Sequence, residues 1–155
     1  MRGFALLYLL AAGDIPTFDQ FHVAERFAGK PAAPILHTRA QRTFRTSIRD
    51  AEQQGPNFAG HFTLAVWGCG AGCNSMAIVD TRSGATYDGP FRLLGFDPSR
   101  VYEGGEEMIE FKIDSRLMIA RGCPEEVQKD CGTYYYEWAG NRLNLLRKSP
   151  AAVKP

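Results

Sequence analysis

The stretch that decides the fold is residues 61–80, which read HFTLAVWGCGAGCNSMAIVD. Residues 61–67 are rich in β-branched and aromatic side chains, which favour strands. Residues 76–79 (Met-Ala-Ile-Val) are apolar in succession, which is typical of a central strand buried on both faces. The segment between them holds three glycines and two cysteines, which is turn composition. We therefore expect two successive strands here, joined by a tight connection.

Further strands are expected downstream, each separated from the next by turn residues. Residues 108–114 alternate apolar and polar side chains, the period of a half-buried strand. In a strand over 133–138, Tyr134, Tyr136 and Trp138 share one face, and we expect that face to line a core. Because short turns join antiparallel neighbours, the sequence predicts an antiparallel meander. The expected strands cover residues 20–27, 61–67, 75–80, 85–87, 108–114, 117–120, 133–138 and 143–146.

One helix is predicted over residues 38–54. Thr38 is a good N-cap residue, and Gly55-Pro56 ends the helix. An apolar face recurs at helical spacing, made of Ala40, Phe44, Ile48 and Ala51. The predicted fold class is therefore α+β: an antiparallel β-sheet meander with one packed amphipathic helix.

A stripe of arginines lies beside that apolar face, at Arg42, Arg45 and Arg49. One interpretation is a ridge that binds an anion or a partner. The favoured interpretation is a solvated face, with Arg49 and Glu52 paired at the i,i+3 spacing.

The composition indicates one globular domain of 155 residues. Its 18 basic and 17 acidic residues give a net charge of only +1, too little to neutralise phosphates, which argues against a nucleic-acid partner. Residues 1–13 combine Arg2, an apolar run over 4–12 and small residues at 11–13, which is typical of a short secretory signal. The alternative is an N-terminal strand or buried helical turn; the run is too short to span a membrane. We expect a signal over 1–13, a domain over 14–150 and a frayed tail over 151–155.

Four cysteines allow three disulfide pairings. The local pairing, Cys69 with Cys73 and Cys123 with Cys131, is favoured because both short loops contain residues that bend sharply. An exported protein forms such bonds, so we expect a periplasmic or secreted location. A four-cysteine zinc site and a thioredoxin-like redox pair both fit the spacing poorly.

The glycine-rich loop over residues 68–73 is the strongest candidate binding surface, because a cross-link lowers the entropy cost of docking it. The alternative is a cross-linked turn with no further role. The candidate ligand is an unknown protein or a small envelope molecule, and no cofactor or metal is expected. The candidate binding residues are Asn57, His61, Trp67, Gly68, Gly70, Ala71 and Gly72.

Two other functions remain open. One is a hydrolase that uses Cys69 or Cys73 as nucleophile with His61 as base. The other is a structural envelope protein without a discrete site. An acidic cluster, favoured as a polar loop rather than a glycosidase or calcium site, consists of Glu103, Glu106, Glu107 and Glu110.

Over residues 18–146 the chain resembles a group of small secreted bacterial proteins of uncharacterised function. The resemblance implies export and a single domain, and it departs from the group at the short leader. It rests on Gly55-Pro56-Asn57-Phe58-Ala59-Gly60-His61, Trp67-Gly68-Cys69-Gly70 with Cys73, Ile78-Val79-Asp80 before Gly84, Asp114-Ser115-Arg116-Leu117, and Tyr135-Tyr136 before Trp138 and Gly140.

Overall fold

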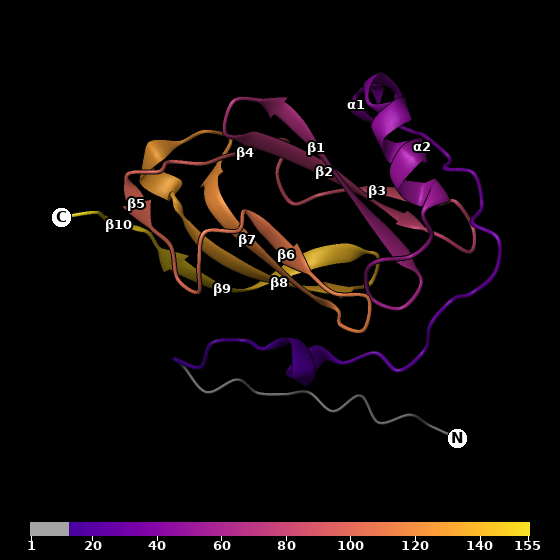
Figure 1. Ribbon diagram of the computed structural model, residues 1–155, viewed down its shortest axis with the longest axis horizontal. Helices are drawn as coiled ribbons and strands as arrows, with labels where there is room; N and C mark the ends of the chain where they lie inside the picture. Colours follow the sequence, from indigo (N-terminus) through magenta and orange to yellow (C-terminus); the bar gives the residue numbers. More distant parts are fainter. Residues whose placement is uncertain (1–12) are drawn as a thin grey trace.

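An antiparallel sheet of eight strands organises the chain, with short helices packed against it and a separate two-stranded sheet made of β5 and β10 (Figure 1). The computed structural model describes residues 13–155, so most of the predicted signal segment lies outside the described residues. The main path of the sheet is β1-β2-β4-β7-β8-β9, with β3 paired to β2 and β6 paired to β7. The elements are η1 (Phe18–Phe21), α1 (Arg39–Thr43), α2 (Arg45–Gln53), β1 (Phe62–Gly70), β2 (Cys73–Asp80), β3 (Thr86–Asp88), β4 (Leu94–Gly95), β5 (Arg100–Val101), β6 (Ile109–Phe111), β7 (Leu117–Pro124), η2 (Gln128–Asp130), β8 (Gly132–Ala139), β9 (Arg142–Pro150) and β10 (Ala152–Val153).

The two halves of the sheet fold toward each other around the main core. Phe62 on β1 meets Trp138 on β8 edge-to-face, with ring centroids 5.1 Å apart. Leu64 and Ile78 from the first half lie in the same buried cluster as Tyr136 from the second half. Burial of these large apolar side chains is the main stabilising term of the fold. The predicted α+β antiparallel architecture is confirmed.

Helix α2 covers the outer face of β1 and β2. Ile48 is fully buried there and packs with Ala77 and Val79 in a second cluster. Thr38 caps the preceding helix α1 as expected: its hydroxyl accepts a hydrogen bond from the Gln41 backbone N–H at 3.1 Å. Among the described residues, neither helix is long and apolar enough to cross a membrane.

The predicted single helix over 38–54 is wrong in one respect, since it divides at Phe44. Phe44 leaves helical geometry, with φ −100° and ψ 24°. Its ring stacks on Trp67 of β1 at 5.1 Å between centroids. A tertiary contact of this kind overrides the local helical pattern.

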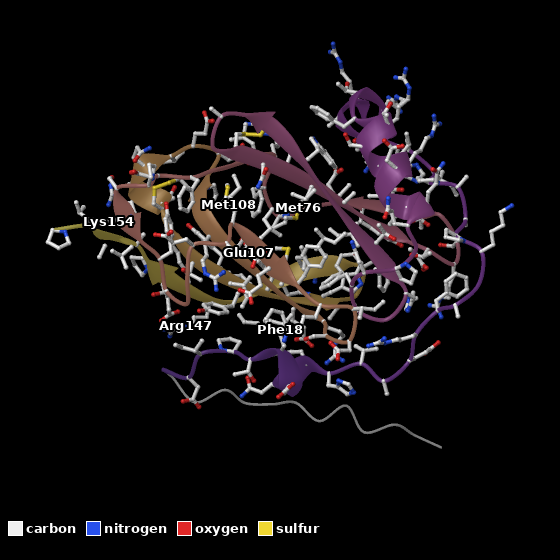
Figure 2. All side chains as sticks on the ribbon, in the orientation of Figure 1. Phe18, Met76, Glu107, Met108, Arg147 and Lys154 are labelled. Carbon is white, nitrogen blue, oxygen red and sulfur yellow. A yellow bond between two sulfur atoms is a disulfide. The ribbon has the colours of Figure 1, made fainter. Side chains whose placement is uncertain are left out.

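Residues 14–34 form a strap that crosses the opposite face of the fold, under β8 and β9 in Figure 1. Phe18, labelled in Figure 2, and buried Phe21 pack against Leu117 and Tyr135 in a third cluster. The strand predicted at 20–27 is wrong, because η1 occupies its beginning and only one isolated bridge, His22 to Ser115, follows. The strap bonds to several separate loops rather than to one strand, as in Phe27 N–H to Gly60 O at 2.9 Å.

The C-terminal residues are also more ordered than expected. β9 extends to Pro150, and Ala152 and Val153 of β10 pair with β5. The Lys154 N–H then donates to the Ser99 carbonyl at 2.8 Å. The prediction of a frayed tail over 151–155 is therefore wrong, because these residues include a short strand. Its partner, β5, has only two residues, so no periodic pattern in the sequence indicates the pairing.

The halves of the sheet are joined by β4. Leu94 and Gly95 pair with β2 on one side and with β7 on the other. Gly122 of β7 lies so close that a Cβ on it would sit 2.2 Å from the Gly95 carbonyl oxygen, and its φ is +154°. Only glycine fits this position without moving the backbone.

We predict that Gly122→Ala destabilises the fold by more than about 3 kcal/mol, because backbone strain and a backbone clash act together. Gly105→Ala is the matched control, since Gly105 has a φ of +135° and nothing within 4 Å of its would-be Cβ. That control should cost about 1–3 kcal/mol. Urea unfolding measures both variants, and equal losses would contradict the role assigned to the Gly95 contact.

Candidate functional site

The glycine-rich loop is the tip of the β1–β2 hairpin. Gly70 pairs with Cys73, so only Ala71 and Gly72 form the turn. Cys69 and Cys73 are joined by a disulfide across this turn. Residues 68–72 are all exposed. The favoured pairing is therefore confirmed here, and the tip is a clamped, solvent-facing element.

The second predicted disulfide, Cys123–Cys131, is present as well, and it is almost fully buried. It lies close to the first, because Gly95 of β4 pairs with Cys73 on one side and Cys123 on the other. Both sulfur–sulfur bonds appear in the left half of Figure 2. The cross-links thus secure the same end of the sheet, consistent with an oxidising extracytoplasmic environment.

Beside Trp67 of the hairpin, a groove of about 480 Å³ lies between α1 and the chain after β3. Trp67 and Phe44 form its aromatic end. The indole Nε1 of Trp67 is buried and has no hydrogen-bond partner among the described residues. We call this hollow the Trp67 groove; it is lined by Ala40, Gln41, Phe44, Trp67, Ser75, Met76, Asp88, Gly89, Pro90, Phe91, Arg92 and Glu125.

The polar side chains around the Trp67 groove are mostly tied to one another. The Gln41 amide donates to Asp88 at 2.8 Å, and Arg92 pairs with Glu125 at 3.1 Å. The Ser75 hydroxyl donates to the Arg92 carbonyl at 2.7 Å. These bonds fix the shape of the groove and leave an apolar floor, which is the usual design of a small binding site.

Asn57, a predicted binding residue, has a structural role at the edge of β1. Its amide oxygen accepts from the Leu64 N–H at 2.7 Å, and its amide nitrogen donates to the Leu64 carbonyl at 3.2 Å. The side chain therefore pairs with Leu64 as the backbone of a neighbouring strand would.

His61 lies at the far end of β1 from the hairpin tip. Arg82 contacts its Nε2 at 2.7 Å, and because guanidinium only donates, the ring accepts there and is neutral. Burial, followed by the charge of Arg82, lowers the pKa of His61, while Asp80 and Glu25 act in the opposite direction. His61 therefore belongs to a local polar cluster rather than to the candidate binding loop.

The structure does not bring together the Cys–His pair of the hydrolase hypothesis. All four cysteines are in disulfides, so neither Cys69 nor Cys73 carries a thiol. Cys69 lies eight positions after His61 along mostly extended chain, a span of roughly 26 Å. Of the predicted binding residues, Trp67, Gly68, Gly70, Ala71 and Gly72 are neighbours, whereas Asn57 and His61 lie elsewhere.

Glu52 is a buried carboxyl group that the sequence pattern placed wrongly. The expected Arg49–Glu52 pair is absent from the described residues, because Glu52 is buried beneath α2 and only 2% exposed. Neither carboxylate oxygen has a hydrogen-bond partner among the described residues. Burial raises the pKa of Glu52 to about 7; the nearby Thr63 hydroxyl opposes the shift and Asp80 adds to it.

The acidic cluster is the predicted polar loop, and it is organised by arginines. Buried Arg121 donates to Glu110 at 2.9 Å and to the carbonyls of Glu103 and Glu107. Arg147, labelled in Figure 2, pairs with Glu103 at 2.9 Å and holds the pKa of that carboxyl below its usual range. Within residues 13–155, no group of His, Cys, Asp and Glu side chains has the arrangement of a metal site.

Comparison of the chain with known protein families, curated proteins and solved structures finds no match. The site is therefore interpreted from its own geometry.

Titration of the denatured, unreduced protein should detect no free thiol, because both cysteine pairs are oxidised. After reduction the same assay should detect four. Two or four free thiols before reduction would contradict the disulfide assignment.

Glu52 should make stability depend on pH. The pKa of Glu52 is about 7 in the folded protein and about 4.5 when unfolded. The contribution of this carboxyl to the free energy of unfolding is therefore fully present below about pH 4.5 and is lost as pH rises through 7. At about 1.4 kcal/mol per pKa unit, the loss approaches about 3 kcal/mol at pH 8. Urea unfolding at pH 5 and pH 8 should show this loss in the wild type and not in Glu52→Gln. Exposed Glu106→Gln, the control, should retain it, and identical pH dependence in all three proteins would refute the assignment.

Proposed function

We propose that this protein is an exported, non-catalytic binding module, inhibitor-like in construction. Its binding face combines the clamped tip of the β1–β2 hairpin with the Trp67 groove. The observation that carries the proposal is the groove itself: an aromatic hollow of about 480 Å³ directly preceding the tip in sequence, through Trp67. A partner that docks on the tip has an apolar hollow nearby for a large side chain.

Preorganisation supports a binding role. The Cys69–Cys73 disulfide holds the tip, and the Gly72 carbonyl accepts the Phe96 N–H at 2.8 Å. A surface that is already ordered loses little conformational entropy when a ligand docks. Both cross-links would persist only in an oxidising compartment, which favours the periplasm or the extracellular medium.

The chemistry of the groove favours binding over catalysis. Its one hydroxyl nucleophile, Ser75, donates to a backbone carbonyl, and no histidine is among the lining residues. Asp88 and Glu125 are both engaged by groove residues. The groove residues therefore supply shape and polarity, without a nucleophile held against a base.

Affinity capture from an envelope extract tests this proposal. Ala40→Arg should fill the groove and Ala71→Glu should place a charge on the tip, and each should remove partners that the wild type captures. Thr46→Arg adds the same bulky charge to an exposed helical position outside the groove, and it should capture as the wild type does. If both test variants capture every wild-type partner undiminished, the proposed face is not the binding surface.

A further inference from the structure

The outer edge of β1 divides into a paired and an unpaired part. Leu64 directs its N–H and C=O away from β2, to the side chain of Asn57. In an antiparallel ladder, residues two apart face the same way, so Val66 and Gly68 also direct their N–H and C=O away from β2. No backbone or side-chain bond reaches these groups from any other described residue outside the β1–β2 pairing. The edge from 66 to 70 is therefore open.

Space and exposure agree with this hydrogen-bond pattern. Val66 is 38% exposed, so the outer edge of β1 is accessible to solvent at this residue. A Cβ on Gly68 would meet only one atom within 4 Å, and a Cβ on Gly70 would meet none. With no side chain on Gly68 or Gly70, little bulk stands on the faces of the sheet beside this edge.

The opposite end strand of the sheet is protected in the usual way. β9 carries Arg142, Arg147, Lys148 and Pro150, and its pairing with β8 contains an irregularity at Tyr135–Tyr136. Charges, proline and bulges are the devices by which edge strands avoid pairing with other chains. Residues 66–70 have neither charge nor proline. Their one irregularity is a register shift between Gly68 and Gly70 at the hairpin tip, where the Cys69–Cys73 disulfide fixes the end of the strand.

We propose that an extended segment of a partner protein binds by adding a strand to β1 along residues 66–70. This inference rests on the proposed binding function and specifies its mode. The partner's backbone would exchange hydrogen bonds with Val66 and Gly68, continuing the row that the Asn57 side chain begins at Leu64. Backbone pairing supplies affinity in this recognition mode, and alternate side chains supply specificity.

The side chains of Val66 and Trp67 determine which residue types fit best in the added strand of the partner. Alternation places Val66 on the core-facing side and Trp67 on the outer side, where it stacks with Phe44. A strand beside them would set an apolar residue against Val66 and an apolar or aromatic residue near Trp67. The favoured partner segment is therefore an alternating stretch with bulky apolar side chains.

The length of the open edge favours a peptide segment over a second copy of this chain. Five extended residues span roughly 17 Å, which limits the added contact to a few hundred Å². A stable protein dimer needs about 1,200 Å² or more. A single strand from a partner uses such a short edge efficiently, with additional contact at the hairpin tip.

The test uses a phage-displayed library of short linear random peptides, selected on the full chain. Val66→Pro removes the outward N–H, and because that N–H faces away from β2, it breaks no bond of the sheet. Val66→Thr keeps the N–H and nearly the same shape. Selected peptides should lose at least about tenfold in affinity on Val66→Pro and little on Val66→Thr. In the unsubstituted protein, the amide protons of Val66 and Gly68 should exchange fast alone and slowly with peptide bound.

Three results would overturn the inference. Peptides that lose binding on Ala40→Arg but keep it on Val66→Pro, with both amides still exchanging fast, would leave the binding function standing and exclude strand addition. Failure of the library to yield any peptide sensitive to Ala40→Arg, Ala71→Glu or Val66→Pro would count against both proposals. Concentration-dependent dimerisation that Val66→Pro abolishes would make the occupant a second copy.

Discussion

The fold depends on a two-residue strand. Among the described strands, β4 (Leu94 and Gly95) alone pairs with both the β1–β2 half of the sheet and the β7–β9 half. The backbones there are so close that Gly122 cannot carry a side chain against the Gly95 carbonyl. One disulfide lies on each side of this junction. The cross-links therefore hold the place where the sheet has fewest hydrogen bonds, and the remainder relies on its apolar core.

Most of the long strands can be predicted from the sequence, because their local pattern agrees with their burial in the fold. Strands such as β2, β7 and β8 are long and carry dense apolar or alternating side chains, so local pattern and tertiary burial agree. The alternation of Tyr134, Tyr136 and Trp138 correctly predicts the face that lines the main core. The sequence did not predict the strap, β4, β5 or β10. The conformation of these segments depends on backbone partners far away in the sequence. In addition, a strand of two residues is too short to show a periodic pattern.

The candidate site was only partly predictable. The cysteine spacing and glycine content of residues 68–73 correctly indicated a clamped hairpin, and Trp67 does line a groove beside it. The motif around Asn57 suggested a binding residue, but the Asn57 amide instead hydrogen-bonds to the backbone of Leu64 at the edge of β1. The rest of the groove comes from α1 and from residues 88–92, and only the tertiary packing of helix on sheet brings these together. Glu52 looked like a surface partner of Arg49, because helical spacing does not say which way a residue at the border of the apolar face turns.

The strap has a consequence for the rate and order of folding. The Ser115 hydroxyl donates to the Phe18 carbonyl across 97 positions of the chain, and the Val23 N–H bonds to the Asp114 carbonyl. Contacts between residues so far apart in the sequence slow folding, because a long loop must close, at a cost in entropy, before the contacts can stabilise the chain. We therefore expect the cluster around Phe21 and Tyr135 to form late, after β7 and β8 have paired. A chain that completes its outer layer last stays open longer while it folds, and this leaves more time for the Cys69–Cys73 and Cys123–Cys131 bonds to form.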